Sequence, residues 1–275
     1  GERTALTQPF PTKPPAFDRQ GATVDNLIDF TPELRAEALA ITEQYVIGPL
    51  FTPPSVAGDG PNDTKGTIQL PGSQGGADVQ GAAFDPETGY LYIPSITSPF
   101  VADVREGNPD RTNLAFVKGG RQWIGGPRGL PLFKPPYGRI TAIDMNRGEI
   151  VWMKPNGDGP RNHPAIRHLN LGPLGGPGRP APLATGTLLF IGQGSTILPG
   201  GARVPDGMPP EIVTNYGGRL LRAYDKATGD VVWETELAAG MIAPPVTYMA
   251  GGKQYLLVSP GDVNTPGEML AFALP

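Results

Sequence analysis

The sequence contains no cysteine and only two histidines, His163 and His168. Disulfide bonds, thiolate metal sites and a cysteine nucleophile are therefore excluded, and most zinc sites need more histidines than are present. No run of about 18 apolar residues occurs, so no segment is expected to span a membrane. The first residues include neither an initiating Met nor the apolar core of a signal peptide, and we expect the chain to be a processed or partial product.

Positive charge is also scarce. The formal net charge is −4 and the basic residues form no stripe, so the electrostatic footprint of a nucleic-acid-binding protein is missing and no nucleic acid is expected as a partner. Glycine (39 residues) and proline (34 residues) make up more than a quarter of the chain. They lie between clear strand patterns, so we interpret them as turns and ordered loops.

Three segments of the chain repeat one pattern: Ala, then Asp two residues later, then Gly four residues after the Asp. The copies are Ala83–Ile93, Ala142–Trp152 and Ala223–Trp233. The second and third end in Trp, and the first has Ile93 in that place. A repeat of this complexity indicates repeated structure.

Each copy predicts a β-hairpin with a tight turn. The Asp would cap backbone N–H groups in the turn, and the Gly would supply a positive φ. Repeated hairpins favour radially arranged sheets, as in a β-propeller, with Trp152 and Trp233 packed on a neighbouring blade. The predicted structural residues are Trp152, Trp233, Asp85, Asp144, Asp225, Gly89, Gly148 and Gly229.

One short helix is expected near the N-terminus. Thr31 fits an N-cap, Pro32 the first helical position and Glu33 the first turn, and Gly48-Pro49 would end the helix. The rest alternates strands and turns, with long loops at 99–136 and 154–182. We therefore predict an N-terminal extended segment and helix (residues 1–66) packed on C-terminal propeller blades (residues 67–275), in an all-β chain.

Several uncommon motifs together resemble the quinoprotein dehydrogenases, above all the membrane-type glucose dehydrogenase group. They include residues 7–15 (Thr-Gln-Pro-Phe-Pro-Thr-Lys-Pro-Pro), 17–21 (Phe-Asp-Arg-Gln-Gly), 89–95 (Gly-Tyr-Leu-Tyr-Ile-Pro-Ser), 155–160 (Pro-Asn-Gly-Asp-Gly-Pro) and 222–237. The repeat is similar to the tryptophan docking motif of this superfamily. The resemblance covers essentially the whole chain.

This resemblance implies part of an eight-bladed β-propeller that binds pyrroloquinoline quinone with a calcium or magnesium ion. It implies hydride transfer from a sugar or alcohol to the quinone, a ubiquinone or cytochrome as electron acceptor, and a periplasmic location, with any membrane attachment through a partner or missing segment. The family's catalytic Asp lies upstream of the matched region, so no catalytic residue is assigned here. We expect the N-terminal half of the ring to be a separate chain or fragment.

The segment 75–82 matches a stretch that commonly reads Gly-Gly-Ala-Asn-Trp-Gly-Gly in the family, where the Asn contacts the quinone. Here Asp78 and Val79 replace the Asn and Trp. A carboxylate near an anionic quinone is repulsive unless a cation lies between them. Asp78 is therefore either a cofactor or cation contact or an ordinary turn residue.

A second candidate segment, 178–183, matches a place where the family has paired glycines near the cofactor; here Pro180 and Ala181 replace them. Arg179 could pair with a quinone carboxylate or be a solvated loop residue. In the last loop the family often has a His. No His is present here; Thr265 is nearest by alignment to the end, and Asp262 is a polar candidate that could equally be a turn residue.

Other polar residues have weaker signals. Asn156 and Asp158 could bind a cation through oxygen or simply form an Asx-rich turn. His163 and His168 are interpreted as surface histidines. Trp123, between glycines, could cover a cavity or a partner.

Two functional hypotheses remain. The chain could be the C-terminal portion of a quinone-dependent sugar or alcohol dehydrogenase. It could instead be a non-catalytic propeller scaffold or binding subunit that has lost the quinone site. The replaced Asn, the missing glycine pair and the missing His favour the scaffold, whereas the extent of the family match favours the enzyme.

Overall fold

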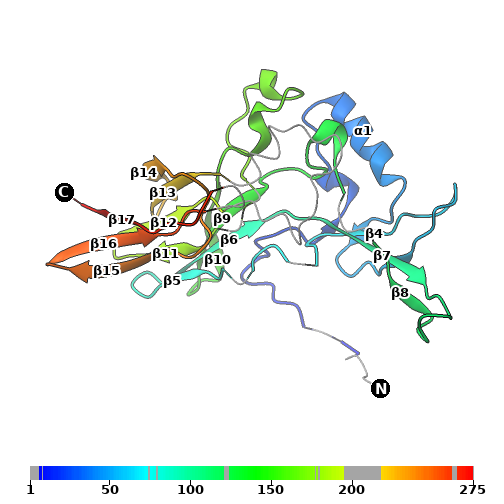
Figure 1. Ribbon diagram of the computed structural model, residues 1–275, viewed down its shortest axis with the longest axis horizontal. Coiled ribbons are helices and arrows are strands. Elements are labelled where there is room, and N and C mark those ends of the chain that lie inside the picture. The colour runs from blue at the N-terminus through cyan, green and yellow to red at the C-terminus, as the bar shows by residue number, and fades with distance from the viewer. Residues whose placement is uncertain are drawn as a thin grey trace.

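The computed structural model describes residues 6, 7, 9–73, 75–78, 80–120, 124–176, 178, 180–194, 218–261 and 265–274. Within these ranges the chain is mostly β, as predicted, with one α-helix, α1 (Pro32–Thr42). Four short 3-10 helices accompany it: η1 (Val24–Asn26), η2 (Pro127–Gly129), η3 (Gly159–Asn162) and η4 (Arg167–Leu169). Figure 1 shows that the molecule is elongated, with α1 and the last hairpin toward opposite ends.

Sheet I is a four-stranded antiparallel sheet in the order β5-β6-β9-β10. Its strands are β5 (Ala83–Asp85), β6 (Tyr90–Ile96), β9 (Gly138–Asp144) and β10 (Glu149–Pro155). The two inner strands pair along their full length, from Tyr90 with Asp144 to Ile96 with Gly138. The sheet therefore depends on a pairing between strands that are distant in sequence.

Sheet I corrects one expectation about the repeats. The first two copies of the pattern do not belong to separate sheets; they form the two hairpins of one sheet, β5–β6 and β9–β10. The turn chemistry is local, so it predicts a hairpin but not which sheet the hairpin joins. The first copy is the N-terminal hairpin of its sheet, and the copies that end in Trp are C-terminal hairpins.

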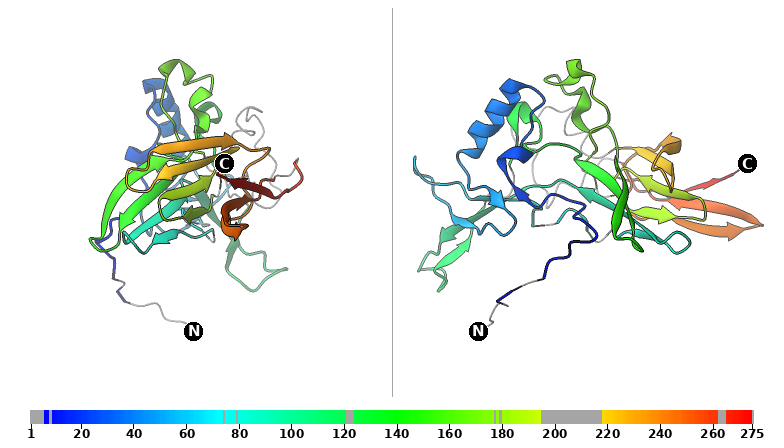
Figure 2. Two further views of the ribbon diagram at one scale, coloured as in Figure 1. Left: turned by 90° about the vertical axis from the view of Figure 1, so that its left-hand side faces the viewer. Right: turned by 180° about the vertical axis from the view of Figure 1, so that it is seen from behind.

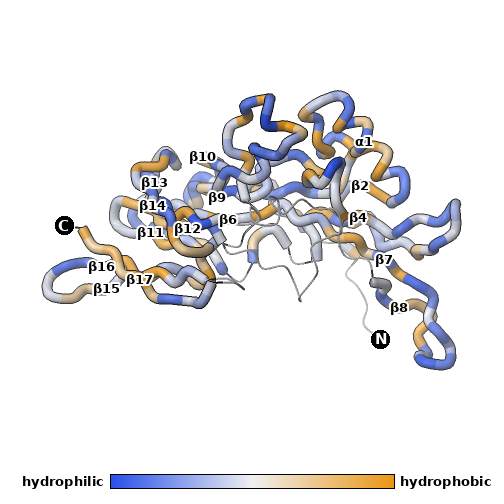
Figure 3. The backbone as a smooth tube through the Cα atoms, turned by 45° about the horizontal axis from the view of Figure 1, so that its top comes forward, coloured by the Kyte–Doolittle hydropathy of each residue, from blue (hydrophilic) through white to orange (hydrophobic). Residues whose placement is uncertain are grey.

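Sheet II repeats this plan, and sheet III follows it with three strands. Sheet II runs β11-β12-β13-β14, and sheet III runs β15-β16-β17. The strands are β11 (Pro182–Ala184), β12 (Leu188–Gly192), β13 (Leu220–Asp225), β14 (Val231–Glu236), β15 (Val246–Ala250), β16 (Lys253–Val258) and β17 (Leu270–Ala273). Both views in Figure 2 show the three sheets side by side. In Figure 3 hydrophilic residues mark the start of β16, beside the tip of the β15–β16 hairpin.

The three repeated turns have similar geometry. The carboxylates of Asp85, Asp144 and Asp225 each accept a hydrogen bond from the backbone N–H two residues later, at 2.8 to 3.1 Å. The glycines that close the turns, Gly89, Gly148 and Gly229, have φ values of 75°, 67° and 70°. A side chain would be strained at these values, which explains the fixed Asp-to-Gly spacing.

The seam between sheets I and II is centred on Lys226, in the turn of the third copy. Its backbone carbonyl accepts hydrogen bonds from Trp152 Nε1 (3.0 Å) and from the Tyr92 hydroxyl (3.2 Å). Its Nζ donates to Asp85 Oδ2 (2.6 Å) and to the carbonyl of Thr185 (2.9 Å). Both ends of this lysine therefore hold the two sheets together.

The two repeat tryptophans differ in their surroundings. Trp152 is 8% exposed and its ring lies against Gly229. Trp233 is 40% exposed and meets Phe272 of β17 edge to face, with ring centroids 5.9 Å apart. Only Trp152 is therefore buried against a turn of the following sheet.

A second group of strands lies nearer α1. Strand β1 (Gly21–Ala22) pairs with β2 (Gly48–Pro49). The other sheet contains β7 (Phe100–Glu106), flanked by β3 (Ser55–Val56), β4 (Thr67–Gln69) and β8 (Phe116–Lys118). Strands β7 and β8 and the helix η2 fall inside residues 99–136, where only a loop was predicted. That prediction was wrong because it gave the Gly and Pro residues of this segment more weight than the strand pattern of Phe100–Glu106, in which Val101 and Asp103 are buried.

Helix α1 begins as the sequence predicts, with Thr31 Oγ1 accepting a hydrogen bond from the Leu34 amide (3.3 Å). It ends at Thr42, earlier than Gly48. Its buried residues Leu34 and Ala38 share a hydrophobic core with Ile68, Phe133 and Ile166. This core joins the N-terminal segment to the loops 124–137 and 163–174, so contacts cross the predicted boundary between residues 66 and 67.

Candidate functional site

A pocket forms where two loops that are distant in sequence meet the end of β6. The loop before β5 contributes Gly75, Gly76, Asp78, Gln80 and Gly81, β6 contributes Pro94, Ser95 and Ile96, and the segment before β11 contributes Pro180. The pocket is shallow and open to solvent, with a cavity volume of about 10 Å³, which is room for about one water molecule. Two of the segments singled out from the sequence, 75–82 and 178–183, are therefore neighbours in the structure.

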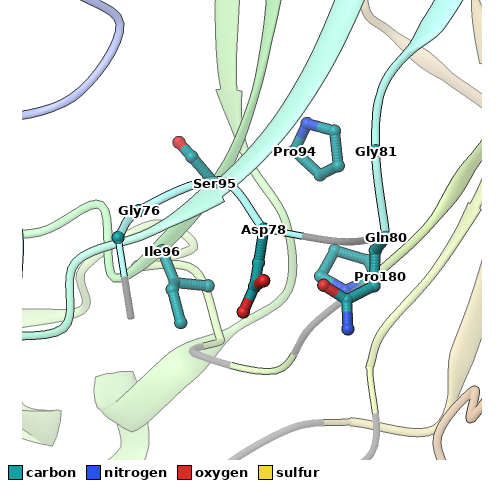
Figure 4. A pocket seen from close by; sticks show the side chains of 9 residues that line it. Gly76, Asp78, Gln80, Gly81, Pro94, Ser95, Ile96 and Pro180 are labelled. Atoms are coloured by element: carbon teal, nitrogen blue, oxygen red, sulfur yellow. The ribbon is translucent and has the colours of Figure 1, made fainter. Parts of the chain in front are cut away.

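Figure 4 shows how the pocket side chains lie. The carboxylate of Asp78 and the side chain of Ile96 point to the same side, and the hydroxyl of Ser95 points away from it. Gln80 and Pro180 lie beside each other. The backbone keeps the loop compact, since the Gly81 amide donates to the Asp78 carbonyl (2.9 Å) and the Ile96 amide to the Gly76 carbonyl (2.8 Å).

The nine residues that line the pocket are called the wall below. A buried ion pair, Asp18 with Arg139, lies behind the wall, next to Gly76. The Arg139 Nη2 donates to Asp18 Oδ1, and the two side chains are 3% and 5% exposed respectively. The Asp18 Oδ1 also accepts from the Arg19 amide (2.7 Å). Burial raises the pKa of Asp18 against the opposing effect of Arg139, and burial lowers the pKa of Arg139. Each partner is thus charged at a desolvation cost that the other offsets.

Arg139 uses its guanidinium to hold the end of β6. Its Nε donates to Ser95 Oγ (2.9 Å), and its Nη1 donates to Thr97 Oγ1 and to the carbonyl of Pro136, both at 3.1 Å. Arg19 adds bonds from Nη2 to the carbonyls of Lys134 (2.7 Å) and Pro135 (2.9 Å). The N-terminal segment is therefore attached to the rim of sheet I.

Asp18 and Arg139 were missed as candidate site residues because they are 121 positions apart and neither lies in a local pattern. Residues 17–21 were noted only as part of the family resemblance. An Arg at the second position of the apolar strand 138–144 is a weak signal that a buried partner exists.

Several sequence candidates have structural roles in the described part of the chain. Asn156 is 2% exposed; its Oδ1 accepts from the Tyr224 hydroxyl (3.3 Å) and its Nδ2 donates to the Gly192 carbonyl (3.3 Å). Asp158 pairs with Arg161 (3.3 Å). Asn156 therefore ties the end of sheet I to strands β12 and β13 of sheet II, and the Asp158 ion pair stays within its own turn.

The histidine prediction was half wrong. His168 is exposed as expected, but His163 is only 7% exposed, and its Nδ1 accepts a hydrogen bond from the Ala165 amide (3.1 Å). It closes the turn between η3 and η4. Ala181 is buried beside Pro180 at 4% exposure. Val79, Arg179, Asp262 and Trp123 lie outside the described residues.

The wall fits a flat, polycarboxylated quinone in shape but not in charge. Glycine backbone at 75, 76 and 81 with Pro94, Ile96 and Pro180 suits one face of a planar ring. The charge does not suit the carboxylates, because Asp78 is the only ionisable residue among the described residues of the wall. Nor do the described residues contain a group of three or more His, Cys, Asp or Glu able to hold a metal. No reaction step is therefore derived through the quinone.

A membrane-spanning helix is not found among the described residues, since none of their helices has the required length and hydropathy.

The sequence matches the family described as "PQQ: Glucose/ethanol/alcohol dehydrogenase, beta-propeller domain" over residues 1–256. It is 27% identical over 247 residues to quinoprotein glucose dehydrogenase A of Acinetobacter calcoaceticus, covering 82% of this chain and 27% of that protein. It is 29% identical over 313 residues to quinoprotein glucose dehydrogenase of Escherichia coli (strain K12), covering 100% of this chain and 34% of that protein. The chain thus spans about a third of the length of these curated relatives.

Among solved structures, the quinohemoprotein alcohol dehydrogenase of Comamonas testosteroni is similar, with a TM-score of 0.45 and 20% sequence identity. The similarity covers 82% of this chain and 32% of that one.

Proposed function

Because the chain belongs to the PQQ glucose/ethanol/alcohol dehydrogenase β-propeller family, we propose that it is part of a quinone-dependent dehydrogenase that oxidises a sugar or alcohol hydroxyl to a carbonyl. The curated relatives are named glucose, glycerol and quinate dehydrogenases, among others, and these names define the substrate class. Pyrroloquinoline quinone would supply the hydride acceptor, and ubiquinone or a cytochrome would be the electron acceptor, with no step assigned to a residue of this chain. The proposed location is the periplasm.

One observation carries this proposal: the segments 75–81 and 180–181, which match cofactor-contacting stretches of the family, line or adjoin one pocket. In the proposed enzyme this pocket is one wall of the quinone site. Asp78, Val79, Arg179, Ala181 and Asp262 are the proposed cofactor-binding residues. Arg179, next to Pro180 in the sequence, supplies the cation that the described wall lacks, and a calcium or magnesium ion balances Asp78.

We further propose that the remaining parts of the enzyme lie outside this sequence. The catalytic Asp and the principal metal ligands belong to an N-terminal portion, present as a separate chain or fragment, that completes an eight-bladed ring. Residues 1–66 pack on the blades formed by residues 67–275. Trp152 and Trp233 act as docking tryptophans between blades, with Trp233 buried more fully once the ring is complete.

The test is spectroscopic and kinetic. The protein, purified with any chain that accompanies it, is mixed with the quinone and calcium. We expect a quinone absorbance that remains after gel filtration, and reduction of a dye acceptor when glucose, glycerol, ethanol or quinate is added. A protein that retains no quinone with either calcium or magnesium would contradict the enzymatic function.

The second candidate is a non-catalytic propeller scaffold or binding subunit. It is favoured by the acidic Asp78 in a wall whose described residues offer no cation to a polycarboxylate. A scaffold would bind no quinone but would still assemble with a second chain. Sedimentation of the chain alone tests the missing portion: we expect self-association or partial unfolding, and a compact monomer of 28.9 kDa with cooperative unfolding would contradict it.

A further inference from the structure

Position 76 requires glycine because a neighbouring side chain occupies the space of a Cβ atom, and not because of its backbone conformation. A Cβ built on Gly76 would lie 1.5 Å from Asp18 Oδ2 and 2.7 Å from Asp18 Cγ. The φ of Gly76 is not in the left-handed region that favours glycine, so the backbone would accept alanine. The carboxylate of Asp18 therefore fills the space directly behind a residue that lines the pocket.

The same carboxylate fixes the other side of the wall through Arg139. The guanidinium of Arg139 is held by Asp18 Oδ1, and from there it binds Ser95 Oγ and Thr97 Oγ1. Between these two contacts lies Ile96, whose side chain points to the side of Asp78 in Figure 4 and whose amide donates to the Gly76 carbonyl. Asp18 thus contacts one strip of the wall, residues 75–78, directly and reaches the other strip, residues 94–96, through Arg139.

Removing the Asp18 charge would leave the buried Arg139 guanidinium without its ion-pair partner. Arg139 is 3% exposed and has no other ion-pair partner among the described residues. A buried guanidinium without its carboxylate must move toward water or another acceptor, and that movement would release Ser95 and Thr97. The Oδ2 atom of Asp18 is buried without a hydrogen-bond partner in the described structure, so no hydrogen bond offsets its desolvation at that atom.

We infer that Asp18 is a positioning residue for the pocket, acting on Gly76 by contact and on Ser95 and Ile96 through Arg139. Asp18 does not touch the ligand. It sets the distance between the two strips of the wall and hence the orientation of Asp78. Identifying the ligand as the quinone rests on the proposed function, whereas the positioning role itself does not.

The first experiment measures the wall without any ligand. In the purified protein carrying Asp18→Asn, hydrogen exchange should speed up in a peptide covering residues 90–97, by about tenfold or more, as expected when a charge-assisted hydrogen bond is lost. A peptide covering β13 should exchange as before. Glu37→Gln is the matched control, because it removes an exposed ion pair with Arg128 and leaves the pocket intact. Unchanged exchange at 90–97 would overturn the inference.

The second experiment approaches the same contact from the pocket side, by adding a methyl group that must displace the Asp18 carboxylate. Gly76→Ala should weaken binding of pyrroloquinoline quinone with calcium by about tenfold or more, since small displacements in a site are costly. Gly172→Ala, at a glycine with nothing within 4 Å of a built Cβ and no left-handed φ, should have no effect.

The two experiments separate the inference from the proposed function. A merely structural role for Asp18 would lower the denaturation midpoint but leave the affinity of the folded fraction unchanged, and that result would overturn the inference. If the unmodified protein binds no quinone, the proposed function fails. The exchange measurement then decides the positioning role, with Gly76→Ala expected to speed exchange at 90–97 and Gly172→Ala not.

Discussion

Trp152 Nε1 donates a 3.0 Å hydrogen bond to the backbone carbonyl of Lys226, and the two residues belong to different sheets. The indole is 8% exposed and covers Gly229, which closes the same turn. The contact joins the end of one copy of the repeat to the turn of another.

Truncating Trp152 should therefore cost more than truncating Trp233. Trp152→Ala should lower the free energy of unfolding by about 3–5 kcal/mol, the usual loss for a large buried aromatic. Trp233→Ala should cost clearly less in the isolated chain, because that ring is 40% exposed. Urea denaturation of both variants measures the difference. Equal losses would mean that Trp233 is also buried in solution.

The glycine beneath the indole gives a second prediction. A Cβ at Gly229 would lie 2.7 Å from Cδ2 and Cε3 of Trp152, whereas a Cβ at Gly251 would meet nothing within 4 Å. Both glycines have positive φ, 70° and 56°. Gly229→Ala should therefore destabilise by about 1–3 kcal/mol more than Gly251→Ala, the excess being overpacking rather than backbone strain. Thermal or urea unfolding of the two variants measures this excess. Equal free energies of unfolding would indicate that the Trp152 indole does not lie against Gly229.

The buried Asp85–Lys226 pair predicts a dependence of stability on pH. Burial opposes the charge of Asp85, but hydrogen bonds from Lys226, Thr88 and the Glu87 amide outweigh it and lower its pKa below the ordinary 3.8. A carboxyl whose pKa is lowered on folding stabilises the protein above its unfolded pKa, and this contribution is lost as pH falls through the folded pKa. The loss should therefore develop below about pH 4.

Asp85→Asn tests that dependence. At neutral pH it should cost about 3–5 kcal/mol, because Lys226 would remain charged, buried and unpaired. The variant should also lose the part of the pH dependence due to Asp85. Asp144→Asn is the control, since Asp144 caps the equivalent turn through the amides of Asn146 and Arg147. Unfolding free energies from about pH 7 to about pH 3 decide the matter; similar curves for both variants would contradict it.

A further prediction concerns Asp78 in the proposed quinone site. If a divalent cation bridges Asp78 and the quinone, the unmodified protein should bind the quinone only with calcium or magnesium present. Asp78→Asn should weaken this cation requirement and leave quinone affinity intact or higher. Calorimetric titration with and without a chelator measures both. A variant with an unchanged cation requirement would show that Asp78 does not face the ion.

Local chemistry explains what the sequence predicted correctly. The Asp-to-Gly turns, the Thr31 cap and the strands around residues 142, 223 and 255 depend on neighbours within a few positions. Strand order does not: the copies at 83–93 and 142–152 share a sheet through the pairing of β6 with β9. No short-range signal encodes such a pairing.

The candidate site divides in the same way. Residues 75–81 and Pro180 could be brought together only through the family resemblance, because their own spacing says nothing of contact. Asp18 and Arg139 were missed because a buried ion pair between distant segments leaves no pattern in either segment. His163 was placed at the surface from its Pro-flanked loop, yet hydrogen bonding within that loop buries it.

The double use of Lys226 has a mechanical consequence. Its carbonyl and its ammonium group hold opposite sides of the seam, so sheets I and II cannot slide past each other by one residue without breaking bonds at both ends together. Stretching the chain between residues 83 and 236 should therefore meet one large resistance rather than two smaller ones.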